Sequence, residues 1–128
     1  MGQQNPTVMV SLGGNAISPK NESGTIDEQF AHTRESLAAV MGFVKRRYNI
    51  CISHGNGPQV GAELQRNELT QEVIPPLPLG VLVANTQGAI GYMIQQSLQN
   101  ALYTQDANRE VVSIISQVKV DKDDPALK

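Results

Sequence analysis

The sequence has one cysteine, Cys51, and only two histidines among its 128 residues. A single thiol cannot close an intramolecular disulfide, and one cysteine with two histidines does not make a recognisable zinc site. Long apolar runs are also lacking: those around 79–84 and 111–115 are far too short to cross a bilayer, and the N-terminus has no signal-peptide core. We therefore expect a cytoplasmic protein with no metal site of its own and no membrane partner.

An excess of positive charge is missing as well. Ten Lys and Arg residues against twelve Asp and Glu residues give a formal net charge of −2. Without a basic excess the chain is poorly suited to neutralise a phosphate backbone, so we expect no nucleic-acid partner. Hydrophobic residues make up 40% of the chain and charged residues 17%, a balance typical of a globular protein, and the length allows one domain, 1–128.

What the sequence does contain is a set of short apolar runs that predict β-strands. Residues 8–12 run into Gly13-Gly14, and residues 50–53 run into His54-Gly-Asn-Gly57. A third run, 111–116, has no glycine after it. The pattern of strand, glycine turn and helix therefore occurs twice.

Helical patterns separate these strands. A capping box, Thr25 to Glu28, opens a helix that we expect to reach Arg47. Residues 71–78 contain three prolines and predict a loop, and 79–103 predict one long helix or two. Strands alternating with helices predict the α/β class, with a mainly parallel sheet and right-handed crossovers.

The two glycine turns are the candidate binding elements. In an open α/β sheet, ligands bind at the carboxyl ends of the strands, where backbone N–H groups can surround phosphate oxygens. An isolated Gly-Gly is more often a simple tight turn, but two turns after two strands favour a phosphate cradle. We expect both turns to converge on one sheet edge. No Walker A loop is present, because no Gly-Lys-Ser/Thr occurs anywhere.

One alternative use of the second turn stays open. Gly55, Gly57 and Gly61 form a GxGxxxG pattern after a strand, close to the fingerprint of an NAD(P)-binding module. Against it, Pro58 follows the second glycine at once, and the acid at plausible distance, Glu72, falls in the proline loop.

Few side chains in the sequence are candidates for acid–base or nucleophilic catalysis. His54 ends an apolar strand and is interpreted as structural, and Cys51 is interpreted as an inert, buried thiol. The polar signal lies in amide side chains, which can donate hydrogen bonds to an oxyanion without proton transfer: Asn15, Asn56, Gln59 and Gln87.

Three segments carry a family resemblance. SLGGNAI (11–17), SHGNGPQVG (53–61) and NTQGAIGYMI (85–94) resemble, in this order, the N-terminal lobe of carbamate kinases, a branch of the amino-acid kinase family. Other amino-acid kinases typically carry a lysine two residues before the first glycine of the first turn, where this chain has Ser11. The resemblance implies a three-layer αβα sandwich, a homodimer and a place in arginine metabolism.

The resemblance also implies the reaction and the residues that serve it. The reaction is phosphoryl transfer between ATP and carbamate, giving ADP and carbamoyl phosphate, with Mg²⁺ as the accompanying ion. Carbamate is already an anionic nucleophile, so aligning two anions and offsetting their charge is the main task. Carried over onto this sequence, Asn15 is catalytic and Gly13 and Gly14 bind the transferring phosphate. The expected substrate-binding residues are Gly55, Asn56, Gly57, Gln87 and Gly88. By the same resemblance, residues 86–88 should open a helix near this pocket.

The chain departs from this family in length. Family members are more than twice as long, and their nucleotide pocket and catalytic lysines lie mostly beyond the matching part. Lys20, Lys119 and Lys122 do not stand at positions that the family pattern marks as catalytic. We therefore expect an acceptor-side portion with an exposed apolar patch, inactive alone. A catalytically silent fragment acting through dimerisation is the remaining alternative.

Overall fold

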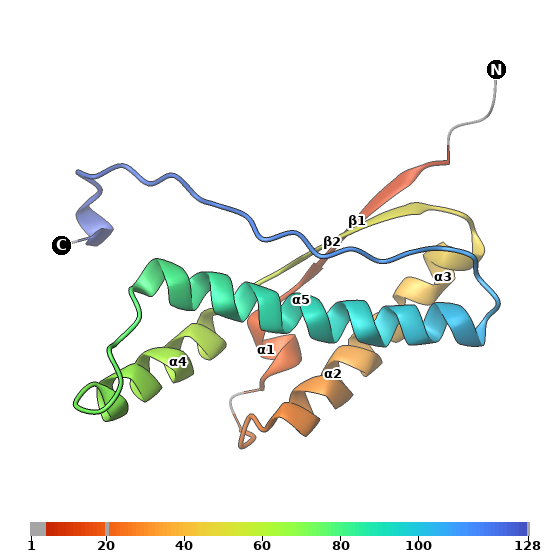
Figure 1. Ribbon diagram of the computed structural model, residues 1–128. Coiled ribbons are helices and arrows are strands. Elements are labelled where there is room, and N and C mark those ends of the chain that lie inside the picture. Colours follow the sequence, from red (N-terminus) through yellow and green to blue (C-terminus); the bar gives the residue numbers. More distant parts are fainter. Residues whose placement is uncertain (1–4, 20, 128) are drawn as a thin grey trace.

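The computed structural model describes residues 5–19 and 21–127, and Figure 1 shows their arrangement. Lys20, one of the cations weighed above, lies outside the described residues. The elements follow in the order β1 (Thr7–Leu12), α1 (Gly14–Ile17), α2 (Ile26–Ala38), α3 (Val40–Lys45), β2 (Asn49–His54), α4 (Gly57–Thr70), α5 (Leu79–Thr104) and a final 3-10 turn, η1 (Pro125–Leu127).

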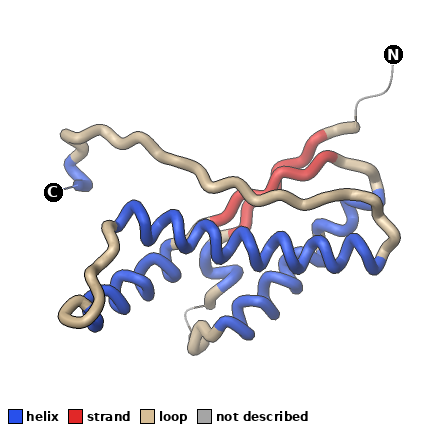
Figure 2. Tube along the Cα trace, viewed as in Figure 1, coloured by secondary structure: helices blue, strands red, loops and turns tan. Residues whose placement is uncertain are grey.

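The sheet consists of β1 and β2, which pair in parallel from Thr7 opposite Asn49 to Leu12 opposite His54. The α/β class and the parallel pairing are confirmed. Helices lie along one side of the two strands (Figure 2), so the third layer of the expected αβα sandwich is not seen in the described ranges.

The core lies between the sheet and α5, with α2 and α3 packed beside it. Strand residues of even number face this core, whereas Met9, of odd number, is 68% exposed. The most deeply buried hydrophobic side chains come from α1, α3 and α5: Ile17, Val40, Leu82, Ile90 and Met93. In the part of the chain that is described, no helix combines the length and apolar character needed to cross a membrane.

The alternation of the strands overturns one sequence expectation. Cys51 is exposed rather than buried, because it is register partner to Met9 on the face of the sheet that the helices leave free. The run Ile50, Cys51, Ile52 reads as uniformly apolar in the sequence. The period of two along a strand nevertheless places the thiol on the opposite face from its neighbours.

The helices agree with the sequence in part. Thr25 and Glu28 form the predicted capping box, with both reciprocal hydrogen bonds present. The expected single helix to Arg47 is wrong, since a turn at Ala39 divides it into α2 and α3. There the Gly42 N–H donates to the Ala39 carbonyl three residues back. The proline segment 71–78 is a loop, as predicted.

The expected third strand is also wrong. Residues 111–116 are extended but pair with no strand in the described structure. Their β-branched side chains favour an extended backbone, but a ladder also requires a neighbouring strand edge. Here side chains of α5 form hydrogen bonds with the backbone of this segment in place of a neighbouring strand. A cavity of about 380 Å³ lies between the segment and β2. At Gly91 of α5, an added Cβ would come within 3.1 Å of Ser113, so glycine permits this close approach.

Candidate functional site

The two glycine turns meet at the carboxyl edge of the sheet. Leu12 and His54 are the last partners in the parallel register, and the Gly55 N–H donates to the Leu12 carbonyl at 3.0 Å. Gly13 and Gly55 therefore leave the sheet side by side. The predicted convergence is confirmed, and the register of two parallel strands is its physical cause.

Close approach of the backbones explains why two of these positions are glycine. A Cβ added to Gly55 would lie 3.3 Å from the Gly14 nitrogen, and one added to Gly14 would lie 3.0 Å from Pro58 Cδ. Gly13 and Gly57 differ, because an added Cβ meets nothing within 4 Å at either residue. The space beside Gly13 and Gly57 is therefore open, as a binding surface requires.

Asn15 is displayed at this edge by the short helix α1. Its neighbour Ile17 is completely buried and fixes α1 to the core, whereas Asn15 itself is exposed. The Asn15 side chain makes no hydrogen bond with the described residues, so both its donor and its acceptor are free. This is the arrangement that the prediction of a contact to a transferring phosphate requires.

Asn56 is turned away from the open space. Its Nδ2 donates to Thr86 Oγ1 at 3.0 Å and approaches the Val83 carbonyl at 3.4 Å. Although Asn56 is the N-cap residue of α4, its side chain does not cap that helix. The cap interaction, usually about 1 kcal/mol, is given up for a bond to α5. Asn56 thus ties the second glycine turn to a buried threonine.

Gln87 and Gly88 lie elsewhere than the sequence suggested. The helix α5 begins at Leu79, so 86–88 lie within it and do not open a helix. The Gln87 amide is engaged on both sides by the backbone of Ser116: Oε1 accepts from its N–H at 2.9 Å and Nε2 donates to its carbonyl at 3.3 Å. Gly88 faces the Ile115 side chain. Their roles in substrate binding stay predictions.

Sequence reasoning missed a serine pair beside the turns. Ser11 and Ser53 are register partners, and their Oγ atoms are 2.7 Å apart on the face of the sheet that also carries Cys51. The signal was present in the strand pattern, since each serine stands two residues before the glycine that ends its strand. The buried Thr86 was missed because its role depends on contact with Asn56.

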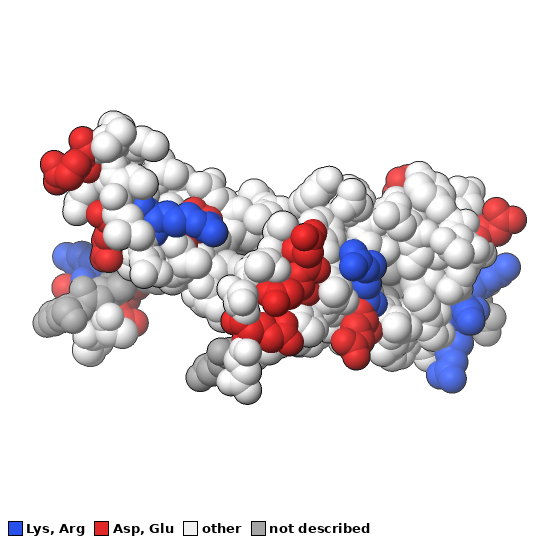
Figure 3. Space-filling model, turned by 90° about the horizontal axis from the view of Figure 1, so that it is seen from below, with Lys and Arg blue, Asp and Glu red and all other residues white. Residues whose placement is uncertain are grey.

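Charged side chains of both signs are spread over the surface of the described residues (Figure 3). On the face shown in Figure 3, acidic side chains lie between basic ones, and no continuous basic surface forms. Within 5–19 and 21–127, no three or more His, Cys, Asp or Glu side chains gather as metal ligands. One titratable pair borders the loop after α1: the His32 Nε2 lies 2.6 Å from Glu22 Oε2, and this hydrogen bond raises the pKa of His32.

Curated relatives are similar in sequence to this chain over nearly its full length. Carbamate kinase of Pyrococcus horikoshii is 43% identical over 123 residues, which is 94% of this chain and 39% of the relative. Carbamate kinase of Escherichia coli K12 is 40% identical over 120 residues, 94% of this chain and 38% of the relative. The chain is a homologue of the carbamate kinases. It spans about 39% of the length of such relatives.

Solved carbamate kinases share the fold as well. The structure of Giardia carbamate kinase aligns with a TM-score of 0.88 and 34% identity, covering 97% of this chain and 43% of that one. Carbamate kinase from Giardia lamblia bound to AMP-PNP aligns with a TM-score of 0.76 and 35% identity, covering 80% of this chain and 36% of that one. No family model matches. The carbamate kinase resemblance carried by the three sequence segments is confirmed.

Proposed function

We propose that this carbamate kinase homologue forms the acceptor-side part of a carbamate kinase site. The reaction transfers the terminal phosphoryl group of ATP to a carbamate oxygen, giving ADP and carbamoyl phosphate, or runs in reverse to make ATP. The meeting of Gly14 and Gly55 at one sheet edge carries the proposal, because it joins the two turns into a single surface.

Each residue has a task that needs no proton transfer. The backbone at Gly13 and Gly14 and the free amide of Asn15 face the transferring phosphoryl group. Gly55 and Gly57 bound the carbamate side, where small residues allow close approach of an anion. Because carbamate attacks as an anion, its oxygen forms the new bond to phosphorus as the bond to the ADP oxygen breaks. No general base is required, and positioning supplies the catalysis.

Mg²⁺ and the nucleotide belong to this proposal in a limited way. The described residues offer no carboxylate cluster that fits Mg²⁺, so we assign none of them to the ion. Nucleotide use is supported by the relative solved with AMP-PNP. We propose that the nucleotide pocket is formed by residues that correspond to the part of the relatives not matched by this chain.

The assembly and setting follow from the same proposal. We propose a homodimer, supported by large hydrophobic side chains that stay exposed in the proline loop, such as Val73 and Ile74. A cytoplasmic location is supported by the single cysteine. Arginine metabolism is proposed from the carbamate kinase resemblance alone.

The NAD(P)-binding alternative is less favoured by the geometry. In a dinucleotide-binding turn, the third glycine permits close packing of the helix on the strand. Here Gly61 is the third glycine, and a Cβ added to it would meet nothing within 4 Å. Neither glycine of α4 is therefore required by such packing.

A chimera tests the proposed function directly. The aligned 39% of Pyrococcus horikoshii carbamate kinase is replaced by this chain, and ATP formation from ADP and carbamoyl phosphate is measured. We expect activity in the chimera and a large loss with Asn15→Leu or Gly57→Leu. Met9→Leu, on the exposed face of β1, is the control that should stay active. A folded but inactive chimera, or saturable NAD(P) binding by a chain indifferent to carbamoyl phosphate, would reverse the proposal.

A further inference from the structure

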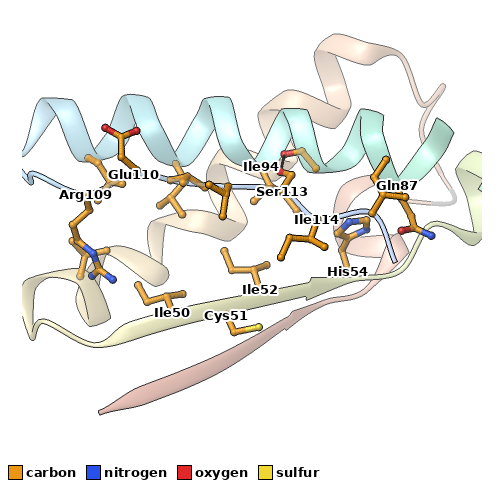
Figure 4. Close-up of a pocket in the computed structure, with 17 residues that line it drawn as sticks. Ile50, Cys51, Ile52, His54, Gln87, Ile94, Arg109, Glu110, Ser113 and Ile114 are labelled. Atoms are coloured by element: carbon orange, nitrogen blue, oxygen red, sulfur yellow. Dashed lines mark hydrogen bonds between the residues drawn. The ribbon is translucent and has the colours of Figure 1, made fainter. Parts of the chain in front are cut away.

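Gln59 is an amide side chain for which the site described above has no use. Of the other amide candidates, Asn15 lies free beside the glycine turns, whereas Gln87 borders the cavity next to β2 (Figure 4). Gln59 lies in the first turn of α4, directly after Pro58, the residue against which Gly14 packs. It therefore belongs to the helix that follows the second glycine turn, beside the contact of that turn with the first.

Two hydrogen bonds connect Gln59 with the backbone that follows the first glycine turn. The Gln59 Nε2 donates to Gln29 Oε1 of α2 at 3.3 Å, and the Gln29 Nε2 donates to the Gly24 carbonyl at 2.8 Å. Gly24 lies in the connection between α1 and α2, and its φ of +70° is the left-handed conformation that favours glycine. We call Gln59, Gln29 and the Gly24 carbonyl the glutamine relay. The relay joins α4 to the chain that leaves α1.

The direction of each bond in the glutamine relay is fixed by its last member. A carbonyl can only accept, so the Gln29 amide must turn its nitrogen toward Gly24 and its oxygen toward Gln59. The Gln59 nitrogen must then face Gln29, which leaves Gln59 Oε1 buried and without a hydrogen-bond partner among the described residues. Turning the Gln59 amide over would bring two acceptor oxygens together. Neither orientation of this amide therefore satisfies every atom.

The unpartnered oxygen indicates that Gln59 does more than fill space. A buried acceptor without a donor costs free energy, and an apolar side chain of similar length, such as methionine, would avoid that cost. What glutamine has and methionine lacks is the N–H that bonds to Gln29. Because this bond is the longer of the two in the glutamine relay, we expect it to affect the position of the connection more than the unfolding free energy.

The position of α1 depends on the connection that the glutamine relay holds. The helix α1 has four residues, contacts both α2 and α4, and is anchored by the buried Ile17. A Cβ added to Gly24 would lie 3.3 Å from Ser18 Oγ, so Gly24 packs against the residue that directly follows α1. β1 holds α1 on one side, and the glutamine relay holds it on the other. Asn15, which α1 displays, is thereby fixed relative to α4.

We infer that Gln59 is a positioning residue, which acts through Gln29 to hold Asn15 at a fixed distance from the second glycine turn. The inference rests on the proposed function, in which the phosphoryl group lies beside Asn15 and the carbamate beside Gly57. That reaction depends on the alignment of two anions and not on proton transfer. A small shift between the two turns should therefore slow the transfer step without weakening substrate binding.

A double-mutant cycle followed by hydrogen exchange of the intact chain tests the glutamine relay. The variants are Gln59→Met, Gln29→Met and the two together, and the matched control is Gln65→Met, at an exposed glutamine of α4. We expect exchange at 14–18 and 22–25 to rise about fivefold in Gln59→Met, as the loss of one neutral hydrogen bond implies. The double variant should exchange no faster than Gln29→Met, because both substitutions break the same connection. Gln65→Met should change nothing.

A second variant keeps the shape of the side chain. Gln59→Glu places an acceptor oxygen against Gln29 Oε1 and should raise exchange at the same residues as Gln59→Met does. In the chimera described above, both Gln59 variants should lower kcat for ATP formation about tenfold or more and change the KM for carbamoyl phosphate less than about twofold. Gln65→Met should match the unchanged chimera.

The outcomes separate this inference from the proposed function. Unchanged exchange in Gln59→Met, additive effects in the double variant, an equal response of Gln65→Met, or a loss confined to KM would overturn the inference. An inactive chimera with Gln59 intact would count against the proposed function, whereas hydrogen exchange needs no activity and still decides whether the glutamine relay exists.

Discussion

Replacing Gly14 by alanine tests whether the glycine turns are in direct contact. The added Cβ would come 3.0 Å from Pro58 Cδ and 3.6 Å from Cγ. The proline ring cannot rotate away, and Pro58 is held in the first turn of α4, so relief requires the two turns to separate. Overpacking of this kind costs about 1–3 kcal/mol. The higher helix propensity of alanine offsets up to about 1 kcal/mol. The balance is a net loss of up to about 3 kcal/mol.

Gly57→Ala is the matched control for this substitution. Gly57 is also the first residue of a helix that follows a glycine turn, but its added Cβ meets nothing within 4 Å. Its unfolding free energy should stay the same or rise by up to about 1 kcal/mol through the unfolded state. Urea unfolding followed by far-UV circular dichroism measures both variants against the unchanged chain. Equal effects of the two substitutions would refute the contact between the turns.

Three further outcomes are expected. Thr86→Val removes the acceptor of the Asn56 amide and should lower the free energy of unfolding by about 1–2 kcal/mol; Thr104→Val, at an exposed α5 threonine bound only to its own helix, should cost less in the same urea titration. The hydrogen bond that the Glu22 carboxylate accepts from the His32 ring raises the pKa of His32 above its ordinary 6.5, so this stabilisation is complete below pH 6.5 and is lost as the pH rises through the raised pKa. Thermal melts should show that loss, and His32→Gln should remove it. The purified chain alone should not make ATP from ADP and carbamoyl phosphate at a useful rate, as a coupled assay free of host kinase can check.

Local signals in the sequence predicted the parts of the fold that local physics determines. Two apolar runs ending in glycine became β1 and β2, and Thr25 with Glu28 formed its capping box. Each of these features depends on residues within one turn or one strand. The convergence of the glycine turns was also predictable, because parallel strands place their carboxyl ends together.

Features that depend on distant partners were not predictable in the same way. The run 111–116 has the composition of a strand, but whether it pairs depends on which edge stands beside it. Cys51 is exposed because helices cover one face of the sheet only, and no pattern within β2 says which face that is. Asn56 and Gln87 look like ligands in the sequence. Their amides bond to Thr86 and Ser116, contacts that cross about 30 residues of chain and that no local pattern predicts, while their roles in substrate binding stay predictions.

The chemistry of the edge indicates which half of the proposed reaction this chain can serve. Glycine backbones and the Asn15 amide are neutral donors, so they can orient two anions but cannot neutralise the charge on a transferring phosphoryl group. That charge requires cations, whose loss commonly costs orders of magnitude in rate. The one buried guanidinium nitrogen without a partner among the described residues, on Arg109, lies at the start of β2, the opposite end of the strand from the glycine turns. Positioning of the acceptor is therefore the task that the glycine turns and Asn15 can serve, and in the proposed reaction we expect the compensating charge to come from other groups.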